Sequence, residues 1–287
     1  MKGLIYTGLI ALFVLGQMSC DIVNPEEEIP SYLKIESFEL EETFDVESFG
    51  LSSKIVAANV IVNGETAGVI SIPGKIPVYA DGETTITLDP LVEENGGDNT
   101  LQIYPFFERV DISANFTPRD STTIDVKTKY KADAFFRGSS FSGSDEFFTE
   151  DLDGNGLTQL TISTEGGQVG EGSIGRIVLN AENPAYESAT TASALIDISN
   201  ANQVWLEVQY KSDVDFIFGV TNAANENDRE FGIRGKDEWN TIYFNAANFL
   251  ISQNITTFQL TITAILPSSW SGGDAEILID NVKLVYR

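Results

Sequence analysis

Hydrophobic and polar residues alternate with a period of two in several stretches of the C-terminal half of the chain. The stretch 204–210 (VWLEVQY) is apolar at every second position, and the same alternation recurs over residues 216–220 and 258–264. Because successive side chains of a β-strand point to opposite faces, this pattern predicts strands with one side on a core. A last strand is predicted over residues 275–286.

Shorter runs of β-prone residues, separated by turn signals, fill the N-terminal half. The clearest unit is a hairpin in which residues 56–62 and 66–72 flank Asn63-Gly64, the dipeptide preferred for a two-residue type I′ turn. Further strands are predicted at residues 76–79, 84–89, 100–107 and 122–128, and the prolines that punctuate them are Pro73, Pro77, Pro90 and Pro105. Because proline lacks the amide hydrogen that a strand ladder needs, these positions favour edges and loops.

The spacing of these runs predicts an all-β protein. Strands this short and regular over residues 32–130 suggest an Ig-like β-sandwich of ordinary size. A second β domain is expected over residues 131–287, with the boundary near Lys131, where the chain becomes richer in Gly, Ser and aromatic residues. No long amphipathic helix is evident in either part.

Two sets of motifs carry a resemblance to known domains. The segments IVNGETAGVISIP (61–73) and IPVYADGETTITLDP (76–90) resemble the N-terminal β-sandwich of some Bacteroidota lipoproteins, in which this domain precedes a jelly roll. The segments GEGSIGRIVL (170–179), VWLEVQYKSDVDFIFGV (204–220) and AEILIDNVKLVY (275–286) resemble the galactose-binding-like jelly rolls of carbohydrate-binding modules. Together the resemblances imply an Ig-like β-sandwich followed by a jelly-roll β-sandwich.

The N-terminus has the parts of a secretory signal peptide. Lys2 precedes an apolar run over residues 3–16, which is too short to span a membrane as a helix. The stretch that ends in Ser19 and Cys20 resembles a bacterial lipoprotein signal, although Gln17 departs from the Leu-like residue usual at that position. The resemblance implies cleavage after Ser19 and acylation of Cys20, which would attach the protein to a lipid bilayer. The alternative is an ordinary cleaved signal with a free thiol.

Residues 20–31 predict a flexible acidic tether. They carry charge and prolines but too little apolar content to pack against a domain. A cysteine followed closely by an acidic cluster resembles the export signal of Bacteroidota surface lipoproteins. This resemblance implies a lipid-anchored outer-membrane protein that faces the cell exterior, and the alternative is a protein that faces the periplasm.

The composition excludes several classes of function. The chain has 43 acidic and 17 basic residues, a formal net charge of −26 and no histidine. Such a charge repels nucleic acid, and without histidine or a second cysteine the usual Ser-His-Asp, Cys-His and zinc sites cannot form. We therefore expect neither an enzyme nor a required cofactor. A glycosidase that uses two carboxylates is the one catalytic class left open.

The segment 151–156 (DLDGNG) matches the first half of a calcium-binding loop. The second half is missing, because Ile162 stands where an EF-hand needs a bidentate glutamate. Jelly rolls of the resembled type often carry a structural calcium. That resemblance implies a calcium site formed by Asp151, Asp153, Asn155 and Asp280. The alternative is a polar turn whose side chains bond its own backbone.

Alternation also selects a ligand face on the strand over residues 204–210. If the apolar residues of this strand face a core, then Trp205, Glu207 and Gln209 face outward, where a tryptophan is out of place on a solvated surface. Arg234 is expected to join this face from its own strand. An aromatic ring surrounded by Gln, Glu and Arg side chains commonly holds a sugar, because the ring stacks on apolar C–H groups while the polar neighbours bind hydroxyls.

Three more residues bear on this ligand face. Gln259 and Thr261 are expected to contribute from their strand, and the loop residue Trp270 is a second aromatic candidate. The alternatives are that Trp205 is covered by the first domain or by a loop, and that Trp270 plugs one end of the sandwich, since large aromatic side chains usually serve packing.

These observations favour a non-catalytic binding protein held at a membrane surface. A glycan is the first ligand hypothesis, by resemblance, and the alternative is a protein partner in an envelope assembly. A hypothesis of a different class is a glycoside-active enzyme that uses Glu207 together with an acid on an adjacent strand.

Overall fold

The computed structural model describes residues 27–41, 53–96, 100–142, 147–167, 172–192, 195–221 and 227–287. The predicted signal peptide, Cys20 and most of the tether lie outside the described residues. The described part is built almost entirely of β-strands, with one short helix, α3 (Ala247–Ser252). No helix within these ranges is long and apolar enough to cross a bilayer.

A first sandwich contains eight strands: β1 (Ser31–Leu40), β2 (Ala57–Val62), β3 (Glu65–Ser71), β4 (Gly74–Val78), β5 (Gly82–Glu93), β6 (Leu101–Ile103), β7 (Val110–Phe116) and β8 (Ser121–Thr128). One sheet has the order β4-β1-β8, with β1 and β8 parallel, and the other has the order β3-β2-β5-β6, with β7 also paired to β5. In a constant-type immunoglobulin sandwich the second and third strands lie in opposite sheets. Here β2 pairs with β3, so the Ig-like character is one of architecture and not of strand order.

The predicted hairpin is present as β2 and β3. Asn63 and Gly64 both have positive φ (49° and 88°), as a type I′ turn requires. The expectation that Pro90 stands at an edge or in a loop is wrong, because β5 runs through it while pairing with β2. On the other side of β5, the ladder with β7 ends at Leu88 and the ladder with β6 begins at Leu91. Pro90 therefore lies where no partner needs its missing amide hydrogen.

A second sandwich contains the remaining strands: β9 (Phe135–Ser139), β10 (Phe148–Asp151), β11 (Thr161–Ser163), β12 (Ile174–Leu179), β13 (Ala185–Thr190), β14 (Ile196–Asp197), β15 (Val204–Ser212), β16 (Phe216–Thr221), β17 (Asn227–Ile233), β18 (Lys236–Asn245), β19 (Thr257–Ile265) and β20 (Ala275–Tyr286). One sheet has the order β10-β13-β19-β16-β17, and β14 adds to β19. The other has the order β11-β12-β20-β15-β18, and β9 adds to β20.

The connectivity of this second sandwich is that of a jelly roll. Four antiparallel pairs are nested along the chain: β12 with β20, β13 with β19, β15 with β18, and β16 with β17. This is the pattern of one long hairpin that has been rolled into two facing sheets. The strands predicted at residues 204–210, 216–220, 258–264 and 275–286 are all present, and most of their apolar residues share one core between the sheets.

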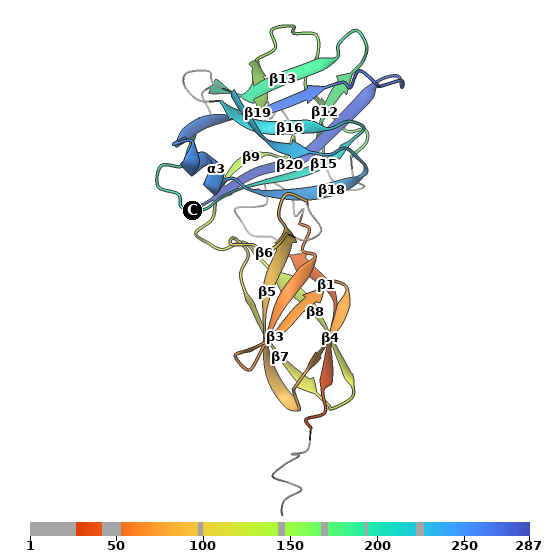
Figure 1. The fold of residues 1–287 in the computed structure, drawn as a ribbon, viewed down its shortest axis with the longest axis vertical. Helices are drawn as coiled ribbons and strands as arrows, with labels where there is room; N and C mark the ends of the chain where they lie inside the picture. The colour runs from red at the N-terminus through yellow and green to blue at the C-terminus, as the bar shows by residue number, and fades with distance from the viewer. Residues whose placement is uncertain are drawn as a thin grey trace, which may run out of the picture.

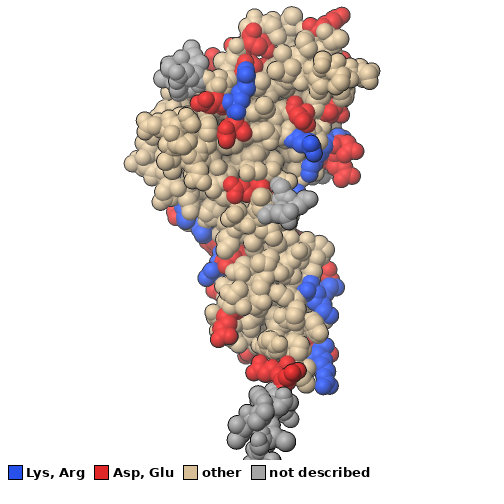
Figure 2. Space-filling model, viewed as in Figure 1, with Lys and Arg blue, Asp and Glu red and all other residues tan. Residues whose placement is uncertain are grey.

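The two sandwiches are stacked end to end in an elongated molecule, with β15, β18 and β20 of the jelly roll facing the first sandwich (Figure 1). The core of the first sandwich continues across this junction and includes Trp205, Tyr243 and Val285 of the jelly roll. Acidic and basic side chains are interspersed on the face of the molecule that Figure 2 shows.

Candidate functional site

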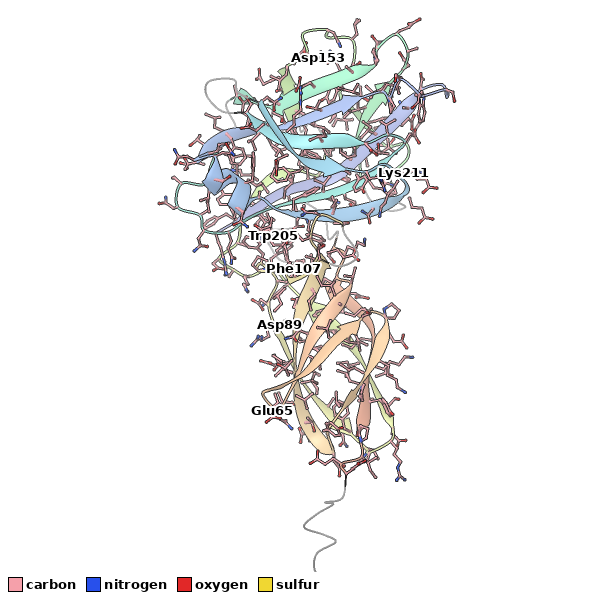
Figure 3. The ribbon with its side chains drawn as sticks, viewed as in Figure 1. Glu65, Asp89, Phe107, Asp153, Trp205 and Lys211 are labelled. Atoms are coloured by element: carbon pink, nitrogen blue, oxygen red, sulfur yellow. The ribbon has the colours of Figure 1, made fainter. Side chains whose placement is uncertain are left out.

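The face predicted to bind a ligand is buried where the two sandwiches meet. Trp205 is only 4% exposed and lies at the junction, near Phe107 of the first sandwich (Figure 3). Its ring packs edge-on against Tyr104, with centroids 5.2 Å apart and an interplanar angle of 87°. Trp205 does face away from the jelly-roll core, as the alternation predicted, but the first domain covers it. The assignment of Trp205 as a ligand-binding residue is therefore wrong.

Glu207 is buried on the same face, in an ion pair with Lys283. The Oε2 atom of Glu207 lies 3.3 Å from Nζ of Lys283, and the two side chains are 1% and 0% exposed. The hydroxyl of Tyr130 donates to both carboxylate oxygens (2.9 and 2.8 Å), and the hydroxyl of Tyr104 donates to Oε1. A carboxylate enclosed in this way has no access to a ligand, so neither the binding role nor the catalytic role considered for Glu207 fits the structure.

The tyrosines at the junction are held in their neutral form. Burial, together with the negative charge of Glu207, raises the pKa values of Tyr104, Tyr130 and Tyr243 well above their usual range. The hydroxyl of Tyr243 accepts a hydrogen bond from the backbone N–H of Lys54 (2.8 Å), so a polar contact accompanies the aromatic packing. Buried polar groups that are fully bonded favour one arrangement of their surroundings.

The other residues predicted for this face are dispersed. Gln209 is buried, and its Oε1 atom accepts a hydrogen bond from the amide of Asn281 (2.7 Å). Arg234 is exposed but follows β17, which belongs to the opposite sheet. Trp270 is half-buried against the jelly-roll core, and its indole N–H donates to the carbonyl of Gly273 (2.9 Å). The structure does not bring these side chains together with Trp205, so a shared ligand face on β15 is wrong.

The calcium-like segment forms a polar turn at the end of the jelly roll far from the first domain (Figure 3). Asp151 accepts from the backbone N–H of Gly154 (2.8 Å), Asp153 from that of Asn155 (3.0 Å), and Asn155 from that of Leu157 (2.8 Å). A second oxygen of Asp153 accepts from the N–H of Glu187 (3.2 Å). These are the bonds of Asx turns, in which side-chain oxygens take up the backbone donors of a tight turn.

Asp280 serves a different structural purpose. It pairs with Gln209 across β15 and β20, at an irregularity in the ladder, and its Oδ1 atom accepts from the N–H of Asn281 (2.7 Å). Asn281 has φ of 45°, a left-handed conformation that asparagine tolerates. Within the described residues, no three acidic or cysteine side chains are grouped so that they could hold a metal ion. The predicted four-residue calcium site is therefore not assembled.

A pocket of about 430 Å³ opens at one edge of the jelly roll, and we call it the edge pocket. It lies between β10, the segment 156–162 and β13. Phe147, Leu160 and Ile162 form its apolar wall, while the polar groups that line it include those of Gln159, Thr161 and Glu187. Mixed linings of this kind, with a few oriented polar groups on an apolar surface, characterise small-molecule sites.

Glu187 links the edge pocket to a polar network on the outer face of the β13-β19-β16-β17 sheet. Its Oε1 atom accepts hydrogen bonds from Nε of Arg229 (3.1 Å), from Nδ2 of Asn227 (2.6 Å) and from Oγ1 of Thr263 (3.1 Å). Nη2 of Arg229 donates to the same oxygen. Within the described residues, every hydrogen bond to this carboxylate goes to Oε1. The network therefore orients the side chain through its Oε1 atom.

Two buried hydroxyl groups also lie in the wall of the edge pocket. The side-chain oxygens of Thr158 and Tyr186 make no hydrogen bond with the described residues, although both are almost fully buried. Burial raises the pKa of Tyr186 to about 12. The Ser188 side chain and the Leu160 backbone lie near the Tyr186 hydroxyl and lower this pKa, but neither makes a regular hydrogen bond with it. A buried hydroxyl without a hydrogen-bond partner lowers the free energy of unfolding by about 1–3 kcal/mol, and a bound water that made the missing bond would recover part of it.

The sequence did not indicate this site. Gln259 and Thr261 were expected on the ligand face of Trp205, and that is wrong because β19 belongs to the sheet opposite β15. Thr261 instead donates to Oδ1 of Asn227 (3.1 Å) in the polar network around Glu187. Glu187 was missed, because the alternation of β13 (AYESAT) is weak. The available signal was Glu187 itself, the single charged residue in a short run of otherwise small and aromatic residues.

Comparisons with known proteins give remote likenesses. No protein-family model and no curated protein matches the sequence. Among solved structures, the chain is similar to a family 29 carbohydrate-binding module from Piromyces equi, with 12% identity and a TM-score of 0.35 over 54% of this chain and 93% of that chain. It is also similar to the family 30 carbohydrate-binding module of a cellulosomal cellulase of Clostridium thermocellum, with 13% identity and a TM-score of 0.35 over 50% of this chain and 87% of that chain.

A third similar structure is that of an exo-beta-agarase, with 11% identity and a TM-score of 0.36 over 48% of this chain and 24% of that chain. At these TM-scores and identities, we assign neither a ligand nor an activity from the likeness.

Proposed function

We propose that the jelly roll is a non-catalytic carbohydrate-binding domain and that its ligand occupies the edge pocket. One observation carries this proposal: Glu187 is among the residues that line the pocket, Arg229, Asn227 and Thr263 orient its carboxylate through Oε1, and within the described residues no hydrogen bond reaches its Oε2. An oriented carboxylate oxygen accepts hydrogen bonds from vicinal hydroxyl groups, which are the defining polar feature of a sugar.

The rest of the edge pocket fits the same ligand class. Its apolar wall of Phe147, Leu160 and Ile162 suits the C–H face of a pyranose ring, and the amide of Gln159 supplies both a donor and acceptors. The volume of about 430 Å³ lies in the range of small-ligand sites. Thr158 and Tyr186, whose side-chain oxygens make no hydrogen bond with the described residues, also line this pocket.

The test is binding to an array of defined oligosaccharides, followed by calorimetric titration of the strongest binder. Glu187→Gln keeps the shape of the side chain and removes its charge. Hydrogen bonds to charged groups contribute about 1.5–3 kcal/mol, so we expect the Kd to rise about tenfold or more. Glu65→Gln, on an exposed strand of the first sandwich (Figure 3), is the matched control and leaves the Kd unchanged. Binding that Glu187→Gln does not weaken would exclude the edge pocket.

We further propose that Cys20 carries the lipid that holds the protein in the outer membrane, with the binding domain facing the cell exterior. The support is the signal-like sequence before Cys20 and the acidic stretch after it. The jelly roll and the described start of the chain lie at opposite ends of the elongated molecule, so an anchor at the N-terminus would present the edge pocket away from the membrane (Figure 1). Metabolic labelling with a fatty-acid analogue should mark the wild type and not Cys20→Ser, and protease treatment of intact cells tests which way the protein faces.

A further inference from the structure

A pair of stacked aromatic rings lies at the surface beside the junction of the two domains. Phe135 begins β9 and pairs with Tyr286 of β20, and their ring centroids are 5.8 Å apart at an interplanar angle of 29°. Phe135 is 61% exposed, whereas Tyr286 packs against the jelly-roll core. The partly buried Tyr286 therefore supports the exposed ring of Phe135.

Polar side chains border this platform on a surface hollow of about 530 Å³, which is lined by Asp133, Phe135, Asn202, Gln203 and Arg287. Arg287 is fixed there, because its Nη1 atom lies 3.2 Å from the carboxylate of Asp133 and its Nε donates to Oε1 of Gln203 (2.9 Å). Backbone bonds hold the same residues together, from Asn202 N to the Arg287 carbonyl (2.8 Å) and from Arg287 N to the Gln203 carbonyl (3.1 Å).

We propose that Phe135 and its polar border form a second carbohydrate-binding site, which takes a single pyranose ring independently of the edge pocket. The phenyl ring has no polar atom, so it matches the C–H face of a sugar, and the amides of Asn202 and Gln203 can both donate to and accept from the hydroxyls around the sugar's rim. A single exposed apolar side chain needs no explanation of its own. The stacked support and the pre-ordered Asp133–Arg287–Gln203 chain distinguish this one, because groups fixed before binding lose little entropy on binding.

The occupant is assigned as a sugar and not as a protein surface because of the chemistry of the border. A protein contact site of useful affinity needs a wide apolar centre, whereas here one exposed ring is bordered by amides, a carboxylate and a guanidinium. The site draws on the residues that connect the two sandwiches (Asp133), on β9 and on the end of β20, and none of these lines the edge pocket.

The experiment is saturation-transfer-difference NMR of the purified protein with four methyl pyranosides (glucoside, galactoside, mannoside and xyloside). We expect at least one of them to receive saturation on its C–H face, Phe135→Ala to weaken its binding about tenfold, and Phe135→Trp to retain it. Because Phe135 is exposed, the melting temperature of Phe135→Ala should match that of the wild type, which separates lost binding from lost folding.

Glu187→Gln is the control that separates the two sites. Transfer that survives Glu187→Gln and fails in Phe135→Ala supports the second site, whatever happens at the edge pocket. Transfer that depends on Glu187 and not on Phe135 assigns the sugar to the edge pocket and overturns the second site. Absence of transfer to all four sugars, or equal transfer in wild type and Phe135→Ala, overturns it as well.

Discussion

The ammonium of Lys283 and the carboxylate of Glu207 form an ion pair that is closed to solvent at the contact between the two sandwiches. Their charged atoms lie 3.3 Å apart, and Tyr130 bonds both partners, donating to Glu207 and accepting from Lys283 (3.2 Å). Two residues of the jelly roll thus share their polar contacts with a residue that precedes it in the chain. The first domain therefore contributes to the stability of this face of the jelly roll.

Lys283→Met should destabilise the protein strongly. It leaves the Glu207 carboxylate buried without its cation, and breaking a buried pair from one side costs about 3–5 kcal/mol of the free energy of unfolding. The double substitution Lys283→Met with Glu207→Leu should recover most of that loss, because no charge is then left buried. Denaturant unfolding followed by tryptophan fluorescence measures both.

The matched control is Arg176→Met, which breaks the ion pair of Arg176 and Glu276 on the jelly-roll surface, where the side chains are 36% and 40% exposed. Exposed pairs contribute about 0–1 kcal/mol, so this variant should unfold almost like the wild type. If Lys283→Met behaved like Arg176→Met, the closed environment of the pair would be refuted.

Trp205→Ala should act on stability and not on glycan binding. The substitution empties a buried aromatic site beside Tyr104, and such truncations cost about 3–5 kcal/mol. We expect calorimetry to show a lower melting temperature, or two transitions where the wild type has one, as the sandwiches lose their contact. Calorimetric titration well below that temperature should give an unchanged Kd, and a lost affinity in a folded variant would return Trp205 to the ligand site.

The strands could be predicted because their signals are local. The turn at Asn63-Gly64 and the alternation over residues 204–210 each depend on a few neighbouring residues, and both appear as expected in β2–β3 and β15. Pro90 shows the limit of such reasoning, because its place in β5 depends on where the ladders of β6 and β7 stop, and those strands come later in the chain.

The ligand face predicted on β15 was wrong because burial is a long-range property. Alternation placed Trp205 and Glu207 on the outward side of β15 correctly, but it could not say that Tyr104 and Tyr130 would cover that side. The one sequence signal was a tryptophan, Trp205, on a face predicted to be solvated. The structure shows the alternative, that the first domain covers Trp205. No local pattern brings Glu187 and Arg229 together, because they come from different strands of one sheet.

Calcium should leave the melting temperature unchanged. Asp153 already accepts from the N–H groups of Asn155 and Glu187, and Asp280 is engaged in the ladder irregularity at Asn281. A bound ligand present at 100 times its Kd would add about 2.7 kcal/mol to the free energy of unfolding. Scanning calorimetry in excess calcium and in excess chelator therefore distinguishes a protein that binds calcium from one that does not. Asp153→Ala should cost about 1–2 kcal/mol through the lost turn bonds in either buffer. A rise in melting temperature with calcium would restore the metal site.

Stability should fall in alkaline solution because of the junction tyrosines. Burial and the charge of Glu207 raise the pKa values of Tyr104, Tyr130 and Tyr243 in the folded protein, whereas an unfolded tyrosine ionises at about pH 10. A pKa that is raised in the folded state contributes to the free energy of unfolding, and this contribution is complete at pH values below the unfolded-state pKa. It is lost as the pH rises through the folded-state pKa. We therefore expect the free energy of unfolding to decline from about pH 10 upward, and the tyrosinate absorbance of these three residues to appear only together with the loss of circular dichroism. Ionisation of every tyrosine near pH 10 with the fold intact would contradict the buried junction.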